Sequence, residues 1–354
     1  MRVIDRYIIT TVLAAVALVG AVLLVLVGLF LFISEQGDLG GRYDTLAALR
    51  YVALNLPDQA MRFLPVFAMI GSLVGLGLLA GGSELTAMRA AGVSILRIGR
   101  AVSMAGLLLA LLAWVVGEYA APAMTQAANE AKARARTEGV SLAGRGGAWV
   151  RDGQLLLNIR QQRGQDLGGV RVFELAPEGG LSAVIEAEGA RPRSEGGWWL
   201  ERAAASRFSG EGVARERSGE PVALRTRVGT EVLAIATADP RQMPVRSLLA
   251  LRAHLEANGQ DTRRHDFTLW SRLSRIAAVF LAILLGLPFV FGSLRSAGTG
   301  ARATLGLVIG LAWYMLQRMV ESGTLAFGLP PFWLAWLPTL LLAAAVGGLT
   351  ARLR

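Results

Sequence analysis

The side chains that could do chemistry in this 354-residue chain are few and far apart. There is no cysteine, which excludes disulfides, thiolate catalysis and cysteine-based metal sites. The two histidines, His254 and His265, are too far apart in sequence to form a typical metal-ligand pair. The single lysine, Lys132, does not belong to a G-x-x-x-x-G-K-[ST] phosphate loop. We therefore expect no metal site and no ATP hydrolysis by a phosphate loop in this polypeptide.

A second set of chemically interesting groups lies near the ends of apolar segments. They are Arg62, Glu118, Arg272, Arg275, Arg318 and Glu321. One interpretation is structural: these side chains reach the membrane surface or form ion pairs, as Arg318 and Glu321 can at i,i+3 spacing. The other is that Arg62, Arg272 or Arg275 faces a cavity that holds an anionic ligand. No carboxylate is expected at a bilayer centre, which disfavours a proton-coupled carrier.

The composition is that of a membrane protein. Hydrophobic residues make up 53% of the chain, charged residues only 18%, and the mean hydropathy is +0.47. The net charge of +10 could indicate nucleic-acid binding. Most of the excess, however, lies in short loops and at the ends of apolar segments and does not form a continuous stripe. We therefore expect no nucleic-acid partner.

Six stretches are long and apolar enough to cross a bilayer, which takes roughly 20 apolar residues of helix. They are 8–33, 63–82, 101–123, 268–292, 303–322 and 332–351. The first run is much longer than the apolar part of a cleavable signal peptide, about 7–15 residues. We therefore expect it to be a retained helix.

Arginines in the short connections predict the orientation, because cytoplasmic loops are enriched in basic residues. With six spans, the two terminal segments and the loops between stretches two and three and between four and five fall on one side. Their arginines are Arg2, Arg6, Arg89, Arg97, Arg100, Arg295, Arg302, Arg352 and Arg354. The connection 323–330 has no basic residue. Both termini are therefore expected in the cytoplasm and the middle segment outside it.

That middle segment has the pattern of β structure. Short β-rich runs alternate with turn residues such as Asp152-Gly153. The runs are 148–151, 154–162, 169–174, 181–188, 198–208 and 221–228. Close spacing of short strands predicts a sandwich or jelly-roll. The predicted fold is six transmembrane helices, three plus three, with an inserted all-β jelly-roll-like domain, and the predicted domains are 1–125, 126–262 and 263–354.

The loop between the second and third stretches predicts a short amphipathic helix over residues 83–94. Ser83 is a candidate amino-terminal cap, and Glu84 lies in the first turn, where the helix dipole favours negative charge. Leu85, Met88 and Arg89 recur on one face, and the helix is expected to end at Gly92. Such a helix either seats in a groove of a partner protein or lies on the lipid surface, and the residues alone leave both open.

Five stretches, in order along the chain, resemble the lipopolysaccharide export permeases, the LptF/LptG family. They are Asp5-Arg-Tyr-Ile8, Ser83-Glu-Leu-Thr-Ala-Met-Arg-Ala-Ala-Gly92, Leu269-Trp-Ser-Arg272, Leu287-Pro-Phe-Val-Phe-Gly292 with Arg295, and Leu329-Pro-Pro331 with Trp336-Leu-Pro338. The inserted domain is similar in position, size and β character, around Trp149-Val-Arg-Asp-Gly153. That stretch, the Asp5 start and Tyr43-Asp44 resemble the LptG branch most.

The resemblance implies a transporter subunit with defined partners. Family members pair as an LptF/LptG heterodimer and bind two copies of the cytoplasmic ATPase LptB, which uses ATP and Mg²⁺. They extract lipopolysaccharide from the inner membrane of Gram-negative bacteria. The β domain would then be periplasmic and belong to a bridge through LptC and LptA. The family's coupling helix maps onto 83–94, where Ser83, Glu84, Leu85, Met88 and Arg89 would contact the ATPase. No cofactor is implied for this chain itself.

The resemblance also implies how a lipid would be held. Exposing each CH₂ of an acyl chain to water costs about 0.8 kcal/mol, so a protein cavity must replace the bilayer. Lipid A phosphates would favour basic residues at the extracytoplasmic rim. The candidates are Arg42, Arg62, Lys132, Arg134, Arg272 and Arg275. Lys132 is the best single candidate, because relatives also have a basic residue at this place after the third span. The segment after the first span, by contrast, lacks the lysine-rich stretch of some relatives.

Two other classes of protein remain as alternatives. A secondary transporter or channel would need a midplane binding site or broken helices. A membrane-anchored scaffold would place the loop helix 83–94 on lipid instead of on an ATPase. Substitution of Glu84 separates these classes, because only an ATPase-coupled permease should lose transport while it still folds.

Overall fold

The computed structural model describes residues 3–40, 43–136, 140–141, 148–163, 166–176, 180–193, 197–209, 212–226, 240–292, 298–323 and 329–352. The chain divides into two compact units. One unit comprises residues 1–37, 49–128 and 263–354 and is helical. The other comprises residues 38–48 and 129–262 and contains the β-strands.

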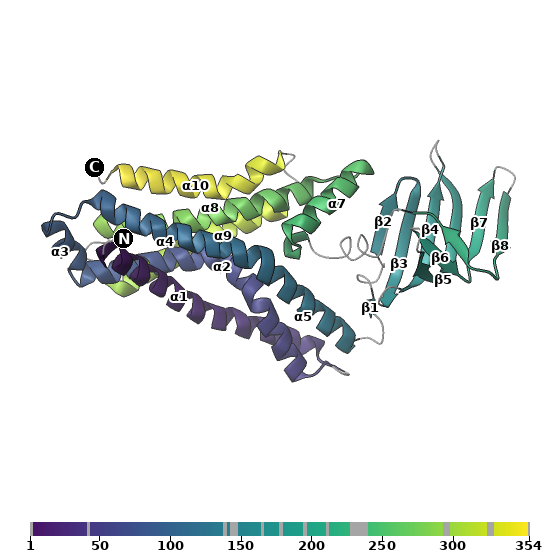
Figure 1. Cartoon of the computed structure of the whole chain (residues 1–354), viewed down its shortest axis with the longest axis horizontal. Helices are drawn as coiled ribbons and strands as arrows, with labels where there is room; N and C mark the ends of the chain where they lie inside the picture. The colour runs from purple at the N-terminus through teal and green to yellow at the C-terminus, as the bar shows by residue number, and fades with distance from the viewer. Residues whose placement is uncertain are drawn as a thin grey trace. The chain divides into compact units, whose positions relative to one another are not determined.

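The helical unit contains six helices that are long and apolar enough to cross a membrane (Figure 1). The long helices are α1 (Val3–Glu35), α2 (Thr45–Gly81), α4 (Ile95–Val115), α5 (Ala121–Arg136), α8 (Arg263–Phe291), α9 (Thr299–Gly323) and α10 (Pro331–Ala351). A π-helical turn, η2 (Val116–Ala120), joins α4 to α5, so that these elements form one continuous span. The prediction of six spans is confirmed. Several helices are longer than the predicted apolar stretches: α2 has 37 residues and begins at Thr45, well before the predicted stretch 63–82.

α2 lies at the centre of the helical packing. In its most apolar window 78% of the residues are buried, whereas the corresponding figure for α1 is 11%. Small residues allow backbones to approach α2 closely. A Cβ added at Gly71 of α2 would lie 2.5 Å from the Cα of Val16 in α1, and one at Gly306 of α9 would lie 2.8 Å from the Cα of Ile70.

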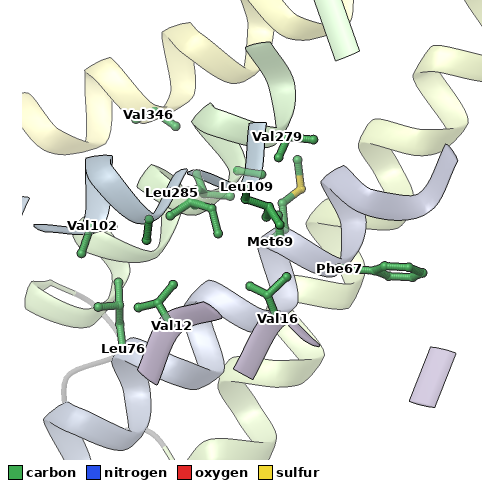
Figure 2. Packing of buried hydrophobic residues seen from close by; sticks show 14 of the residues in the cluster. Val12, Val16, Phe67, Met69, Leu76, Val102, Leu109, Val279, Leu285 and Val346 are labelled. Carbon is green, nitrogen blue, oxygen red and sulfur yellow. The ribbon is translucent and has the colours of Figure 1, made fainter. Parts of the chain in front are cut away.

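Around α2, apolar side chains from α1, α4, α8 and α10 form the helical core (Figure 2). Val12, Phe67, Leu109 and Val279 are among its buried members. Two buried polar contacts cross between helices: Ser72 Oγ donates to the Ala282 carbonyl at 3.1 Å, and the hydroxyls of Ser274 and Thr339 lie 2.7 Å apart. Interhelical hydrogen bonds of this kind hold helices together in a membrane.

The second unit contains nine described strands in one antiparallel sheet. They are β1 (Val140–Ser141), β2 (Ala148–Asp152), β3 (Leu155–Arg163), β4 (Asp166–Leu175), β5 (Leu181–Pro192), β6 (Trp198–Glu201), β7 (Ala204–Ser209), β8 (Gly212–Arg217) and β9 (Val222–Leu224). The sheet forks at β5, where Gly189–Pro192 pair with β6 and Ala183–Glu186 pair with β7. The predicted inserted β domain is confirmed.

One strand prediction needs correction. The run 198–208 was expected to be continuous, but it is divided into β6 and β7 by Arg202, whose φ is 50°. The core of the sheet contains Leu157, Val170, Val172 and Trp198, all almost fully buried. After the strands come η4 (Pro240–Gln242) and α7 (Val245–Ala257), which precede α8.

Candidate functional site

The predicted short helix is present as α3 (Glu84–Ala90), which two residues separate from the end of α2. It ends in two backbone hydrogen bonds, from Gly92 N to Arg89 O and from Val93 N to Met88 O. This is the Schellman motif, which needs a positive φ at Gly92, here 86°. The prediction that Gly92 terminates the helix is therefore confirmed.

The expected role of Ser83 as a side-chain cap is wrong. Ser83 occupies the N-cap position, but its φ of 59° is left-handed and its side chain makes no capping hydrogen bond. An N-cap side chain normally acts from the extended region of backbone conformation. That geometry occurs instead at Ser94, whose side chain accepts a hydrogen bond from Arg97 N and begins α4.

The two faces of α3 differ in burial. Leu85 is 3% exposed and Met88 packs against the helical core, so these two side chains hold α3 on the helical unit. Ser83, Thr86, Ala87 and Arg89 are exposed, and Glu84 is half-buried. Of the five residues predicted to couple to an ATPase, the exposed Ser83 and Arg89 and the half-buried Glu84 are therefore accessible to a partner.

Two interactions connect α1 to the segment around α3. The Tyr7 phenol interacts with the Glu84 carboxylate. Asp5 forms an ion pair with Arg97 of α4, with Arg97 Nε 3.2 Å from one carboxylate oxygen and Nη2 3.5 Å from the other. Asp5 and Tyr7 belong to the Asp-Arg-Tyr-Ile stretch noted in the sequence, but no role could be assigned to them without the fold.

Arg302 was expected in a cytoplasmic loop and is instead in the first turn of α9, where it is 2% exposed. Its Nη1 donates a hydrogen bond to the Gly77 carbonyl near the carboxy end of α2. A cation is favourable there, because the last carbonyls of a helix carry partial negative charge. Arg302 thus stabilises the end of α2 immediately before α3.

Arg62, Arg272 and Arg275 lie together in the helical unit, in one layer with three carboxylates. Arg62 Nε is 2.8 Å from Asp58, and Arg272 is 3.7 Å from Glu118 in η2. Arg275 interacts electrostatically with Arg62, Arg272, Asp58 and Glu321. The predicted Arg318–Glu321 pair is present at 3.4 Å. This charged layer connects α2, η2, α8 and α9.

Lys132 is half-buried on α5, within the second unit. Its Nζ lies 2.9 Å from Asp38 Oδ2 and 5.7 Å from the ring centroid of Tyr43, which is almost fully buried. The cation therefore already has a carboxylate and an aromatic face as neighbours. Arg42 and the side chain of Arg134 lie outside the part of the chain that is described. In the described residues, no group of three His, Asp or Glu side chains is arranged to bind a metal ion.

Six helices long and apolar enough to cross a membrane, a short helix with an exposed polar face and an inserted β domain together describe a multi-pass membrane protein. The family model described as "Lipopolysaccharide export system permease LptF/LptG" matches residues 6–352. The chain therefore belongs to the LptF/LptG family and is a permease component of a lipopolysaccharide export system.

Individual relatives are similar over most or nearly all of the chain. The lipopolysaccharide export system permease protein LptG of Escherichia coli K12 is 30% identical over 340 residues, covering 95% of this chain and 94% of the relative. LptG of Haemophilus influenzae is 28% identical over 360 residues, covering 100% and 99%. LptF of Escherichia coli K12 is 24% identical over 280 residues, covering 77% and 74%. The higher identity and coverage favour the LptG branch.

Proposed function

We propose that this chain is the LptG-type half of a transporter that extracts lipopolysaccharide from the inner membrane of a Gram-negative bacterium. Its partner in the membrane is an LptF-like permease, and the energy comes from a separate LptB-like ATPase dimer that uses ATP and Mg²⁺. The observation that carries the proposal is α3, which Leu85 and Met88 hold on the helical unit while its polar face stays exposed. A helix held in this way can pass a movement of the ATPase into the bundle.

The proposed orientation has both termini and α3 in the cytoplasm and the β domain in the periplasm. Arginine in the short connections supports this orientation, because cytoplasmic loops are enriched in basic residues. In the periplasm the β domain would meet LptC- and LptA-like bridge proteins that continue toward the outer membrane. The proposal assigns no cofactor to this chain.

The first contact with the lipid phosphates is assigned to Lys132. A phosphate that reaches this ammonium group would either displace Asp38, whose Oδ2 lies 2.9 Å from Lys132 Nζ, or bind to the ammonium group beside it. Arg62 and Arg272 are paired with carboxylates, so a phosphate must compete with Asp58 and Glu118 for them. The exchange of a carboxylate for a phosphate keeps each cation paired, which lowers the cost of loading and release.

Co-purification tests the proposed assembly. The chain would be tagged and purified from its native membrane in mild detergent, with proteins identified by mass spectrometry and lipid by extraction. We expect a second permease, a small ATPase with a phosphate loop, and bound lipopolysaccharide. A chain that purifies alone in several detergents would contradict the proposal and favour a secondary transporter or a scaffold.

Charge reversal at Glu84 tests the role of α3. Because an acidic residue at an interface contributes through its charge, Glu84→Arg is expected to weaken ATPase association by about 2 kcal/mol or more. Tyr7→Phe removes the contact with Glu84 but retains the carboxylate, and should leave association in place. Glu130→Arg, an equal charge change on the exposed surface of α5, is the control. Normal viability and ATPase association in Glu84→Arg would refute the assignment.

A further inference from the structure

One face of the β domain carries an arginine-lined hollow that the proposed transport mechanism does not use. Its volume is about 660 Å³, within the range of about 300–1,000 Å³ that is usual for small-molecule sites. Five arginines and two glutamates line it, an excess of three positive charges. The charged residues are Arg160, Arg171, Glu186, Glu188, Arg202, Arg215 and Arg217.

Strand register explains why these charges share one face. Arg171 of β4 is opposite Glu186 of β5, Glu186 is opposite Ala204 of β7, and Ala204 is opposite Arg217 of β8. Directly opposed residues point to the same side of a sheet. Arg171 lies between the buried Val170 and Val172, so this row is on the face opposite the core. The small side chain of Ala204 leaves space between the charged ends of the row.

A second row of residues widens the hollow, and it lies two positions away from Arg171 on β4 and from Glu186 on β5. It includes Gly169 and Glu188, and Arg202 follows at the fork of the sheet. Gly169 has a φ of 62°, and a Cβ there would lie only 3.2 Å from Cδ of Arg160. The missing side chain thus provides space for the aliphatic part of Arg160 beside the strand.

The charges in the hollow are only partly compensated. Arg171 pairs with Glu186 at 2.8 Å, and Arg202 pairs with Glu188 at 3.0 Å. Arg160, Arg215 and Arg217 form no salt bridge with any residue that the structure describes. Guanidinium groups around one concave surface repel one another and concentrate positive potential, which favours an anion between them.

We propose that this hollow binds a phosphate-bearing saccharide, with the arginines on the phosphates and Glu186 and Glu188 accepting hydrogen bonds from hydroxyl groups. Arginine forms paired hydrogen bonds to phosphate oxygens. Carboxylates beside arginines suit a ligand that is both anionic and hydroxylated. A concave site of this volume fits such a compact group better than the flat surface of an acidic protein. The identification of the saccharide as the headgroup of lipopolysaccharide rests on the proposed function.

Calorimetric titration of the complete transporter complex in lipid nanodiscs tests the proposal. The probes are deacylated lipopolysaccharide, the same saccharide after enzymatic dephosphorylation, and inorganic phosphate. We expect the phosphorylated saccharide to bind at least about tenfold more tightly than either of the others, because only it uses charge-assisted and hydroxyl contacts together. Equal binding of inorganic phosphate would overturn the saccharide assignment.

Variants localise this binding to the hollow. The double variant Arg215→Ser/Arg217→Ser should weaken binding of the phosphorylated saccharide at least about tenfold. Ala204→Leu should do the same by filling the space without changing charge. The control is Arg191→Ser with Arg207→Ser, an equal charge change at residues that do not line the hollow, which should alter affinity by less than about twofold. Unchanged affinity in both hollow variants, each verified as folded by its thermal unfolding, would overturn the proposal.

The other outcomes are equally distinct. In one outcome, a periplasmic protein is retained by the unaltered complex and lost from the Arg215/Arg217 variant, while saccharide binding does not change. The hollow would then be assigned to a protein partner instead of a saccharide. In another outcome, the complex contains the ATPase and lipopolysaccharide but binds the saccharide equally with and without Arg215 and Arg217. This would overturn the proposed binding site in the hollow without contradicting the transport function. Absence of the ATPase would overturn the transport function instead.

Discussion

Ser83 and Ser94, at the two ends of the α3 segment, show how backbone conformation decides what the same side chain can do. Ser83 has a left-handed φ of 59° and no capping hydrogen bond. Ser94 has an extended backbone and accepts a hydrogen bond from Arg97 N at 3.3 Å. The sequence pattern predicted a cap only at Ser83, and the backbone angles show that the capping role belongs to Ser94.

The two serines should therefore respond differently to substitution. Ser83→Gly is expected to stabilise the protein by about 0.5–1 kcal/mol, because glycine adopts a left-handed φ without a steric penalty. Ser94→Ala is expected to destabilise it by about 1 kcal/mol through the lost cap. Thermal unfolding of the purified protein in one detergent measures both changes. Equal losses from Ser83→Ala and Ser94→Ala would contradict the assignment of the cap.

Gly77 and Arg302 should show strong non-additivity. A Cβ at Gly77 would lie 2.5 Å from Cδ of Arg302, so Gly77→Ala forces the buried arginine away from the end of α2. Arg302→Ala removes the same contact but also makes room for the new methyl group. The double variant is therefore expected to be at least about 1 kcal/mol more stable than the sum of the two single effects. Additive effects on the unfolding midpoint would show that the contact is unimportant.

Between elements, the Asp5–Arg97 ion pair connects α1, the least buried of the six spans, to the start of α4 beside α3. Asp5→Asn and Arg97→Gln are each expected to lower ATP-driven lipopolysaccharide release about fivefold or more while ATPase association persists. Each change removes the ion pair between α1 and α4 but leaves the surface of α3 unaltered. Release from reconstituted vesicles measures this effect.

A charge swap provides the control for that pair. Asp5→Arg combined with Arg97→Asp restores an ion pair of opposite polarity and should recover release to within about twofold of the unaltered protein. Loss of ATPase association in Asp5→Asn would contradict the assignment, because it would place Asp5 at the docking surface itself.

Element prediction from the sequence succeeded where a single physical signal dominated. Apolar runs located all six spans, yet they did not predict that α2 begins at Thr45, because Arg50, Asn55 and the Pro57-Asp58 pair interrupt the apolar run before residue 63. The strand β8 was missed because every one of its residues is exposed, so Gly212–Arg217 has no buried face to produce an alternating pattern. Arg202 has no sequence signal that reveals its positive φ.

Over the whole molecule, the natural absence of cysteine allows a direct test of orientation. Each of the single replacements Ala87→Cys in α3 and Ser206→Cys in β7 introduces one thiol into a chain that has no other. A membrane-impermeant maleimide applied to intact cells with a permeabilised outer membrane should label position 206 and leave position 87 unlabelled until the inner membrane is opened. Labelling of both positions from the same side would contradict the proposed topology.

The candidate sites were predictable only in part, because they combine residues from distant parts of the chain. Arg62, Arg272 and Arg275 were selected as charges near apolar segments, and the fold brings them together with Asp58, which has no distinguishing sequence feature. Arg302 was assigned to a loop because positive charge near a span usually is exposed, and only tertiary packing against Gly77 shows its buried position. The arginine-lined hollow depends on strand register, which the sequence does not specify.

The central position of α2 has a consequence for natural sequence variation. Where the backbones of α1 and α9 approach α2, at Gly71 and Gly306, there is no room for even a methyl group unless a helix shifts. The outward positions of α1, such as Leu18, Val25 and Phe30, are exposed in this chain and can exchange among apolar residues of different volume. Divergence among orthologues should therefore concentrate on α1 and spare the glycines around α2, although α1 is the more apolar of the two helices.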